Sequence, residues 1–307
     1  MDLSLVIPVK EESENLPQLM REIVAALAPT GYEYEVIAID DGSRDSTWEV
    51  LEQLSKEYNF LQGYRFQFNC GKAAALALGF SKARGKFVAT LDGDLQDDPL
   101  EIPKMIKLLD EGYDLVSGWK IRRLDPWHKT WPSKLFNLTV SAVCGKRLHD
   151  FNCGIKVYRS SVVRFIQLYG DYHRFIPVMA KWQGFRITEM PVAHRARVHG
   201  VSKYGVSRLV SGFLDLVSLM FMKSFSAKPL HFFGLVGLIF MLFGLGICGF
   251  FGYEWLQSGA LHVRPLLLAG GFSLVMSVQF FSLGLLGEMM NGSKKQTYPV
   301  AETLRPE

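Results

Sequence analysis

The sequence of 307 residues predicts an α/β fold with a mostly parallel sheet, followed by two membrane-spanning helices. Three observations predict this fold. Short apolar runs alternate with helical patterns over residues 3–119, acidic turns follow several of these runs, and two long uncharged stretches lie near the end of the chain. The formal net charge of +4 is too small to indicate a nucleic-acid-binding protein, so we expect no nucleic-acid partner.

Predicted strands and helices alternate through the first part of the chain. The strand-like runs are "LSLVIPV", "YEVIAID", "LQGYRFQ", "KFVATLD" and "YDLVSGW", which begin at Leu3, Tyr34, Leu61, Lys86 and Tyr113. Helical patterns lie between them, at Ser13–Leu27 with Ser13 as the expected N-cap, after Asp45 or Ser46, at Ala73–Arg84 and at Pro99–Asp110. Strands joined by such helices pair in parallel, so we expect a doubly wound sheet with helices on both faces.

Acidic residues follow three of the predicted strands. Glu12 comes after the first strand, Asp40 and Asp41 end the second, and Asp92 and Asp94 follow the fourth. The carboxyl ends of parallel strands meet at one edge of a sheet, so these side chains are expected to lie close together. Crowded carboxylates repel one another unless a cation or hydrogen-bond donors gather them, and Mg²⁺ bound to a diphosphate suits such a site. A solvated acidic turn is the alternative.

Two uncharged stretches predict a membrane hairpin. Phe232–Tyr253 and Pro265–Gly287 are each close to the ~20 residues that a helix needs to cross a bilayer. The link between them is short, so the two helices are expected to be antiparallel. Lysines flank the outer ends of the pair and the link carries only Arg264, so the positive-inside rule predicts that both termini are cytoplasmic. A pair of buried core helices is the alternative.

We therefore expect four segments and a location in the inner (plasma) membrane. They are a cytosolic α/β domain at 1–206, an amphipathic juxtamembrane helix region at 207–230, two transmembrane helices at 231–288 and a cytosolic tail at 289–307. The juxtamembrane prediction rests on Ser207–Phe225, where polar residues recur every three to four positions beside a wide apolar face. A core helix of the soluble domain is the alternative interpretation.

Five ordered motifs carry a resemblance to a known family. They are "VIPVKEESENLP", "VIAIDDGSRDST", "NCGKAAALALGF", "ATLDGDLQDDPLEIP" and "DFNCGIKVYR". Their order and spacing resemble glycosyltransferase family 2, and most of all its polyprenyl-phosphate group. The resemblance implies a GT-A fold, a Mg²⁺ or Mn²⁺ cofactor and a homo-oligomer, by resemblance a tetramer. It also implies inverting transfer of one sugar, with UDP-glucose or another UDP-sugar as the first donor candidate, to polyprenyl phosphate, here undecaprenyl phosphate.

Two other functions remain open at the level of sequence. The acceptor could be another lipid, such as diacylglycerol, or the chain could be a membrane module that senses nucleotide sugars without turnover. The Gln-x-x-Arg-Trp motif of processive polysaccharide synthases does not occur, which favours transfer of a single sugar over polymerisation.

The resemblance also implies roles for individual residues. A nucleotide pocket would be formed by Pro8, Val9, Glu12, Asp40, Asp41, Lys72, Asp92 and Gly93. The metal ion on the diphosphate would be held by Asp92, Asp94 and Gln96. Asp94 and Asp150 would be the catalytic residues, with Asp150 as a base or an orienting group, although a turn-capping role is the alternative for Asp150.

A basic stretch and a basic loop are the candidates for binding phosphate groups. The stretch "WKIRRLDPWHKTWPSK" and the loop "HRARVHGVSKYG" supply Lys120, Arg122, Arg123, Lys129, Ser133, Arg197 and Lys203. Their cationic side chains would offset the charge of the acceptor phosphate and the donor pyrophosphate as these approach each other. A basic face that binds lipid headgroups is the alternative for the first stretch, and both interpretations are compatible.

Overall fold

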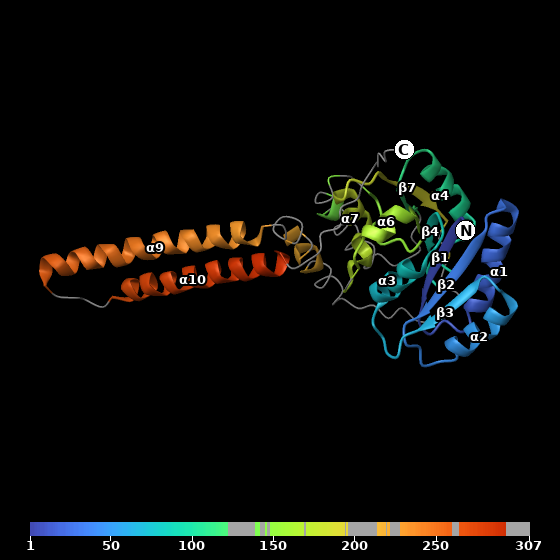
Figure 1. Cartoon of the computed structure of the whole chain (residues 1–307), viewed down its shortest axis with the longest axis horizontal. Coiled ribbons are helices and arrows are strands. Elements are labelled where there is room, and N and C mark those ends of the chain that lie inside the picture. Colours follow the sequence, from blue (N-terminus) through green and yellow to red (C-terminus); the bar gives the residue numbers. More distant parts are fainter. Residues whose placement is uncertain are drawn as a thin grey trace, which may run out of the picture. The chain divides into compact units, whose positions relative to one another are not determined.

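The computed structural model describes most of the chain in two compact units, drawn in Figure 1. Met1–Asp215 forms one unit and Leu216–Thr297 lies in the other. The described residues are 1–121, 139–141, 145, 148–168, 170–193, 195, 214–218, 220–221, 228–259 and 264–292.

A seven-stranded sheet is the centre of the first unit, within the part of the chain that is described. Its strands are β1 (Leu3–Val9), β2 (Tyr34–Asp40), β3 (Leu61–Arg65), β4 (Phe87–Thr90), β5 (Leu115–Lys120), β6 (Lys156–Arg159) and β7 (Ile187–Val192). They lie in the order β3-β2-β1-β4-β6-β5-β7. Only β6 is antiparallel to its neighbours β4 and β5, so the predicted, mostly parallel sheet is confirmed.

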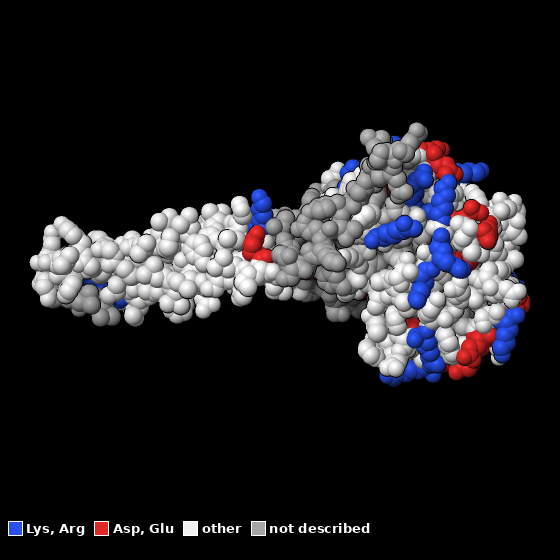
Figure 2. Space-filling model, viewed as in Figure 1, with Lys and Arg blue, Asp and Glu red and all other residues white. Residues whose placement is uncertain are grey.

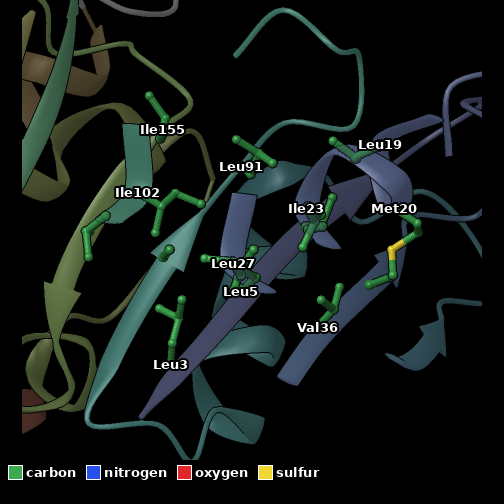
Figure 3. Close-up of a cluster of buried hydrophobic side chains, with 14 of the residues drawn as sticks. Leu3, Leu5, Leu19, Met20, Ile23, Leu27, Val36, Leu91, Ile102 and Ile155 are labelled. Carbon is green, nitrogen blue, oxygen red and sulfur yellow. The ribbon is translucent and has the colours of Figure 1, made fainter. Parts of the chain in front are cut away.

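Helices cover both faces of this sheet, as predicted. They are α1 (Leu16–Leu27), η1 (Ala28–Thr30), α2 (Thr47–Glu57), α3 (Lys72–Lys82), α4 (Glu101–Asp110), α6 (Ser160–Phe165), η2 (Tyr172–Phe175) and α7 (Ile176–Trp182). Apolar side chains of α1, α2 and α4 belong to the same buried cluster as Leu3 and Leu5 of β1, and Figure 3 shows the part that α1 contributes. Ala75 of α3 packs on Ile37 and Ile39 at the opposite face of β2.

The first helix begins later than the sequence predicts. We expected Ser13 to cap it, but α1 starts at Leu16 and its N-cap residue is Asn15. The Ser13 hydroxyl donates a hydrogen bond of 2.8 Å to Oδ2 of Asp45 instead, which joins the turn after β1 to the turn before α2. Burial then holds α1 in place, because fully buried side chains such as Leu19 each contribute about 1.5–3 kcal/mol.

The strand register brings the acidic turns to one edge of the sheet. Val9 is paired with Asp40 across β1 and β2, and Val6 is paired with Thr90 across β1 and β4. The chain therefore leaves these three parallel strands at the same edge. The predicted gathering of the turns after β1, β2 and β4 follows directly from this register.

The second unit contains two long apolar helices, α9 (Pro229–Ser258) and α10 (Pro265–Gly292). Both are long and apolar enough to cross a membrane, with mean hydropathy of 2.3 and 1.8. Most of each apolar stretch is exposed, which does not fit the alternative of buried core helices. The face in view in Figure 2 carries almost no charged side chains along the two helices.

Glycines allow the two helices of this hairpin to approach closely. A Cβ atom at Gly237 would lie 3.0 Å from the Phe281 ring, and one at Gly244 would lie 2.9 Å from the carbonyl oxygen of Gly270. Small residues at such contacts are typical of helix pairs in membranes, where close packing drives association.

Candidate active site

An ion pair between Asp92 and Lys72 lies at the acidic edge of the sheet. Asp92 follows β4, Lys72 begins α3, and Nζ of Lys72 is 2.5 Å from Oδ1 of Asp92. Burial of the Asp92 carboxyl by itself raises its pKa, but the charge and hydrogen bond of Lys72 outweigh burial and lower the pKa to about 2. Asp92 is therefore an anion at neutral pH and can attract a cation.

The loop after Asp92 folds back on itself and buries two further aspartates. Asp94 is 7% exposed, and its Oδ1 accepts a hydrogen bond of 3.3 Å from the backbone N–H of Gln96. Leu95 between them has a φ of 59°, in the left-handed region that residues other than glycine rarely adopt. Such local strain is typical of loops whose shape serves a ligand.

Asp97 in the same loop forms a buried ion pair with Lys120 at the end of β5. Nζ of Lys120 lies 3.0 Å from Oδ1 of Asp97. Burial disfavours the Lys120 ammonium, but the neighbouring Asp97 charge outweighs burial and raises the Lys120 pKa. Lys120 was predicted to bind a substrate phosphate, and in this structure its ammonium is already engaged by a carboxylate. The phosphate role of Lys120 stays a prediction.

Two glycines bring neighbouring turns against the carboxylates. A Cβ atom at Gly154 would lie 2.5 Å from Oδ2 of Asp92 and 2.6 Å from Oδ2 of Asp97, so no larger residue fits there without displacing them. A Cβ atom at Gly93 would lie 3.1 Å from Cγ1 of Val9 and 3.5 Å from Cγ of Glu12. The turns after β1 and β4 therefore touch, which brings four of the predicted nucleotide-pocket residues together.

Asp40 and Asp41 stabilise the neighbouring loops. Oδ1 of Asp40 accepts the backbone N–H of Ser43 at 2.9 Å, and its Oδ2 lies 3.2 Å from Nε of Arg65. Asp41 accepts the backbone N–H groups of Cys70 and Gly71 at 2.7–3.1 Å and so shapes the turn that leads into α3. Binding of the nucleotide base by either carboxylate stays a prediction.

Asp150 is buried beside the same edge, in a loop that is held from two sides. Its side chain is 1% exposed, and Oδ1 accepts the backbone N–H of Asn152 at 3.0 Å, which is the turn-capping contact considered above. Glu189 of β7 holds the preceding residue through two contacts: the backbone N–H of His149 at 2.7 Å and its Nδ1 at 2.5 Å. The His149 ring stacks on Trp119 of β5, with 4.0 Å between ring centroids.

The remaining predicted phosphate-binding residues cannot be placed. Arg122, Arg123, Lys129, Ser133, Arg197 and Lys203 lie outside the described residues. One basic residue of the same loop is described, and the sequence analysis did not single it out. Arg195 donates its backbone N–H to the carbonyl oxygen of Gln96 at 3.0 Å, and its guanidinium pairs with Glu22 and Asp98 at 2.7 and 2.8 Å. It fastens the loop that contains Asp94.

The carboxylates at this edge fit a hard divalent cation. The described part of the chain holds no group of three or more His, Cys, Asp and Glu side chains arranged around one point. Mg²⁺ and Mn²⁺ do not need such a group, since they bind through one or two carboxylates and take their other ligands from water and substrate phosphate. Ionised Asp92 and buried Asp94, two residues apart, supply suitable oxygen ligands.

Comparison with known proteins identifies the family. The model of "Glycosyl transferase family 2" matches residues 4–166, which is more than half of the chain. The chain belongs to glycosyltransferase family 2. It is therefore a glycosyltransferase, and the resemblance read from the five motifs is confirmed. The matched range includes the turns after β1, β2 and β4 and the loop that carries Asp150.

Two similar proteins have names that state a function. The chain is 38% identical to dodecaprenyl-phosphate galacturonate synthase of Rhizobium johnstonii, over 94% of this chain and 88% of that protein. It is 35% identical to undecaprenyl-phosphate 4-deoxy-4-formamido-L-arabinose transferase of Pseudomonas aeruginosa, over 94% of this chain and 84% of that protein. Both names describe glycosyltransferases of the polyprenyl-phosphate group, so the resemblance to that group is confirmed as well.

Solved structures confirm the GT-A fold. Glucosyl-3-phosphoglycerate synthase from Mycobacterium tuberculosis, in complex with Mn²⁺, uridine diphosphate and phosphoglyceric acid, superposes with a TM-score of 0.57 at 16% identity. That match covers 72% of this chain and 78% of the other. Mannosyl-3-phosphoglycerate synthase from Rubrobacter xylanophilus gives 0.55 at 15% identity, over 73% of this chain and 74% of the other. At these identities the likeness shows the fold alone.

Proposed function

We propose that this glycosyltransferase moves one sugar from a UDP-sugar to a polyprenyl phosphate at the cytosolic face of a membrane. One observation carries the proposal. The similarity to two polyprenyl-phosphate sugar transferases extends over 94% of the chain. The 6% of the chain outside the match contains fewer residues than α9 (30 residues) or α10 (28 residues). The similarity therefore includes part of each helix of the apolar hairpin as well as the GT-A domain.

The reaction mainly requires that the acceptor phosphate is correctly placed and that the negative charge of the two phosphate groups is compensated. A lipid monophosphate has a second pKa near ~6, so at neutral pH it is largely a dianion and needs little help from a base. Its oxygen must be held in line with the anomeric carbon of the donor sugar, while two phosphate groups approach each other. Buried Asp150, in its fixed loop, is suited to orient the acceptor. A single transfer in this geometry inverts the anomeric centre.

A divalent metal ion is part of the proposal. Asp92 and Asp94 would hold Mg²⁺ or Mn²⁺, with Gln96 as a further ligand, and the ion would neutralise charge on the donor diphosphate. Mn²⁺ and uridine diphosphate are present in the structure of the mycobacterial glucosyl-3-phosphoglycerate synthase. Lys72, which contacts Asp92 at 2.5 Å, places a positive charge beside the same position.

The proposal also covers the identity of the donor sugar and the orientation of the chain in the membrane. UDP-glucose is the first donor candidate, and the sugars named in the two relatives, galacturonate and 4-deoxy-4-formamido-L-arabinose, are the next. We propose that α9 and α10 span the inner membrane with both chain ends on the cytoplasmic side, and that the enzyme is a homo-oligomer. Positively charged residues flank the outer ends of the hairpin, which supports this orientation. The predicted juxtamembrane region at 207–230 lies largely outside the described residues and stays a prediction.

The test is transfer of labelled sugar into lipid. Purified enzyme in detergent is given undecaprenyl phosphate, Mg²⁺ and a panel of radiolabelled UDP-sugars, with GDP-mannose as a different base. We expect label from one UDP-sugar to appear in the lipid fraction. Mild acid should release this label, because a sugar linked to a lipid through phosphate is acid-labile. Asp94→Ala should abolish transfer, whereas Asp110→Ala, at the exposed end of α4, should not change it.

Other outcomes separate the competing functions. Label in a lipid that resists mild acid, formed only when diacylglycerol is present, would replace the polyprenyl acceptor. Binding of UDP-sugar without transfer to either lipid would contradict the proposal and favour a sensing module.

A further inference from the structure

A small cavity lies next to Asp92, on the side of the sheet covered by α3. Lys72 and Asn152 lie at its mouth, which is open to solvent, and Lys156, Tyr158 and His173 line it more deeply. The cavity volume is about 10 Å³, which is room for about one water-sized group, such as a single ligand oxygen. Gly154, which touches the carboxylates of Asp92 and Asp97, also lines it, so the cavity adjoins the candidate active site.

Lys156 is a buried cation whose donors are mostly unused by the described residues. It lies on β6 and is 4% exposed. Its ammonium donates a hydrogen bond to the carbonyl oxygen of Cys153, and an ammonium group has three N–H donors in all. Burial lowers the pKa of Lys156, since the charged form is poorly solvated there. A buried lysine with unsatisfied N–H donors lowers the stability of the fold, and a bound ligand that accepts hydrogen bonds from it would offset this loss.

His173, which also lines the cavity, has an unsatisfied buried polar atom. It lies on η2 and is 9% exposed, and none of the described residues forms a hydrogen bond with its buried Nδ1. Burial lowers the pKa of His173 well below its ordinary value, and nearby Lys72 lowers it further. The imidazole is therefore neutral, and one of its two nitrogens carries a proton that can be donated.

The geometry points to an oxyanion subsite in this cavity, in which Lys156 and His173 bind an oxygen of a substrate phosphate. The inference rests on the proposed function, in which two phosphate-bearing substrates meet beside Asp92. The Lys156 side chain and the neutral imidazole of His173 suit an anion, whereas the ammonium of Lys72 is paired with Asp92 at 2.5 Å. Lys120, the described lysine of the stretch predicted to bind phosphate, is held by Asp97 at 3.0 Å.

Two phosphates share the required chemistry: that of the lipid acceptor and that of the nucleotide donor. Binding measurements on the full chain in detergent separate them, using farnesyl phosphate for the acceptor and UDP for the donor. Farnesol, which lacks the phosphate, is the matched control ligand. None of these measurements needs turnover.

The variants are chosen to preserve the fold. Lys156→Met keeps the length of the side chain and removes its charge, and exposed Lys181→Met on α7 is the matched control. His173→Leu removes the hydrogen-bonding atoms, whereas His173→Asn keeps a polar atom near the position of Nδ1. A charge-assisted hydrogen bond lost from a buried site weakens binding by roughly 10–100-fold.

We expect Lys156→Met and His173→Leu to weaken binding of one phosphate probe by about this factor, and His173→Asn to restore part of it. Farnesol binding and thermal stability should not fall. Weakened binding of farnesyl phosphate assigns the subsite to the acceptor, and weakened binding of UDP assigns it to the donor. Unchanged binding of both probes by folded variants would overturn the inference.

The outcomes also separate this inference from the proposed function. If the wild-type enzyme transfers sugar and Lys156→Met leaves the KM values for both substrates unchanged, the proposed subsite is rejected and the proposed function is kept. If the wild-type enzyme transfers no sugar but binds a phosphate probe through Lys156, the function is wrong and the subsite stands. If Lys156→Met does not fold, the His173→Leu and His173→Asn pair decides.

Discussion

Gly154→Ala should damage the active site through a displacement that can be calculated. The added Cβ would lie 2.5 Å from Oδ2 of Asp92 and 2.6 Å from Oδ2 of Asp97, whereas ordinary contact begins near 3.4 Å. At least one carboxylate must therefore move by about 0.9 Å, the difference between 3.4 and 2.5 Å. Misplacement of about 1 Å costs on the order of 10²-fold in rate, and crowding in a packed site costs about 1–3 kcal/mol of stability.

The assay compares kcat/KM for sugar transfer with the thermal unfolding midpoint. We expect Gly154→Ala to lower kcat/KM by about 100-fold and the midpoint by roughly 2–4 °C for each kcal/mol. Gly63→Ala in β3 is the control, since its Cβ would lie 3.5 Å from the Trp48 ring, in ordinary contact. A folded Gly154→Ala variant with wild-type kcat/KM would refute the placement of these two carboxylates in the active site.

Three further predictions follow from contacts around the site and the sheet. Burial raises the pKa of Glu35, but hydrogen bonds from Arg84 and Ser4 outweigh it and hold the pKa below its ordinary value. Such a carboxyl contributes stability above the pKa of the unfolded chain, near ~4.3, and loses it as pH falls through the folded pKa. Arg84→Ala should lower the unfolding free energy and should move the acid loss of stability to higher pH; melting curves that keep the wild-type pH dependence would contradict this. Arg195→Ala should lower kcat/KM by about 10-fold while the melting midpoint falls little, because partly exposed ion pairs contribute about 0.2–1 kcal/mol each; an unchanged kcat/KM would show that the loop needs no such fastening. Glu189→Ala should lower kcat by about 10-fold, since the loop that contains Asp150 loses its anchor, and Glu189→Gln, which keeps an acceptor for the His149 N–H, should restore most of it; equal losses in both variants would rule out this positioning role.

The parts of the fold that the sequence predicted are those set by local patterns. Apolar periodicity marked the alternating strands and helices, and the rule for parallel strands placed the turns at Glu12, Asp40 and Asp92 at one edge. The insertion of β6 between β4 and β5 could not be predicted, because it depends on pairing between Thr90 and Lys156, far apart in sequence. The start of α1 was misplaced for a similar reason, since the Ser13 hydroxyl finds its partner 32 residues away.

In the candidate site as well, the sequence predicted the residues that a local pattern marks. The four aspartates between Asp92 and Asp98 were singled out because so many charges directly follow an apolar strand. Lys156 and His173 were not singled out, because neither belongs to a recognisable motif, and each becomes notable only when β6 and η2 line the same cavity. One signal was available: strand alternation in "KVYR" places Lys156 on the same face as Tyr158, which is fully buried.

Mass spectrometry of the lipid product tests the central claim most directly. Purified enzyme is incubated with undecaprenyl phosphate and each UDP-sugar in turn, and undecaprenol replaces the lipid phosphate in the control. The account predicts one new lipid, heavier than undecaprenyl phosphate by a single sugar residue, with an equal amount of UDP released and no product from undecaprenol. A product built on undecaprenol, a lipid carrying several sugar residues, or no product with any donor would contradict it.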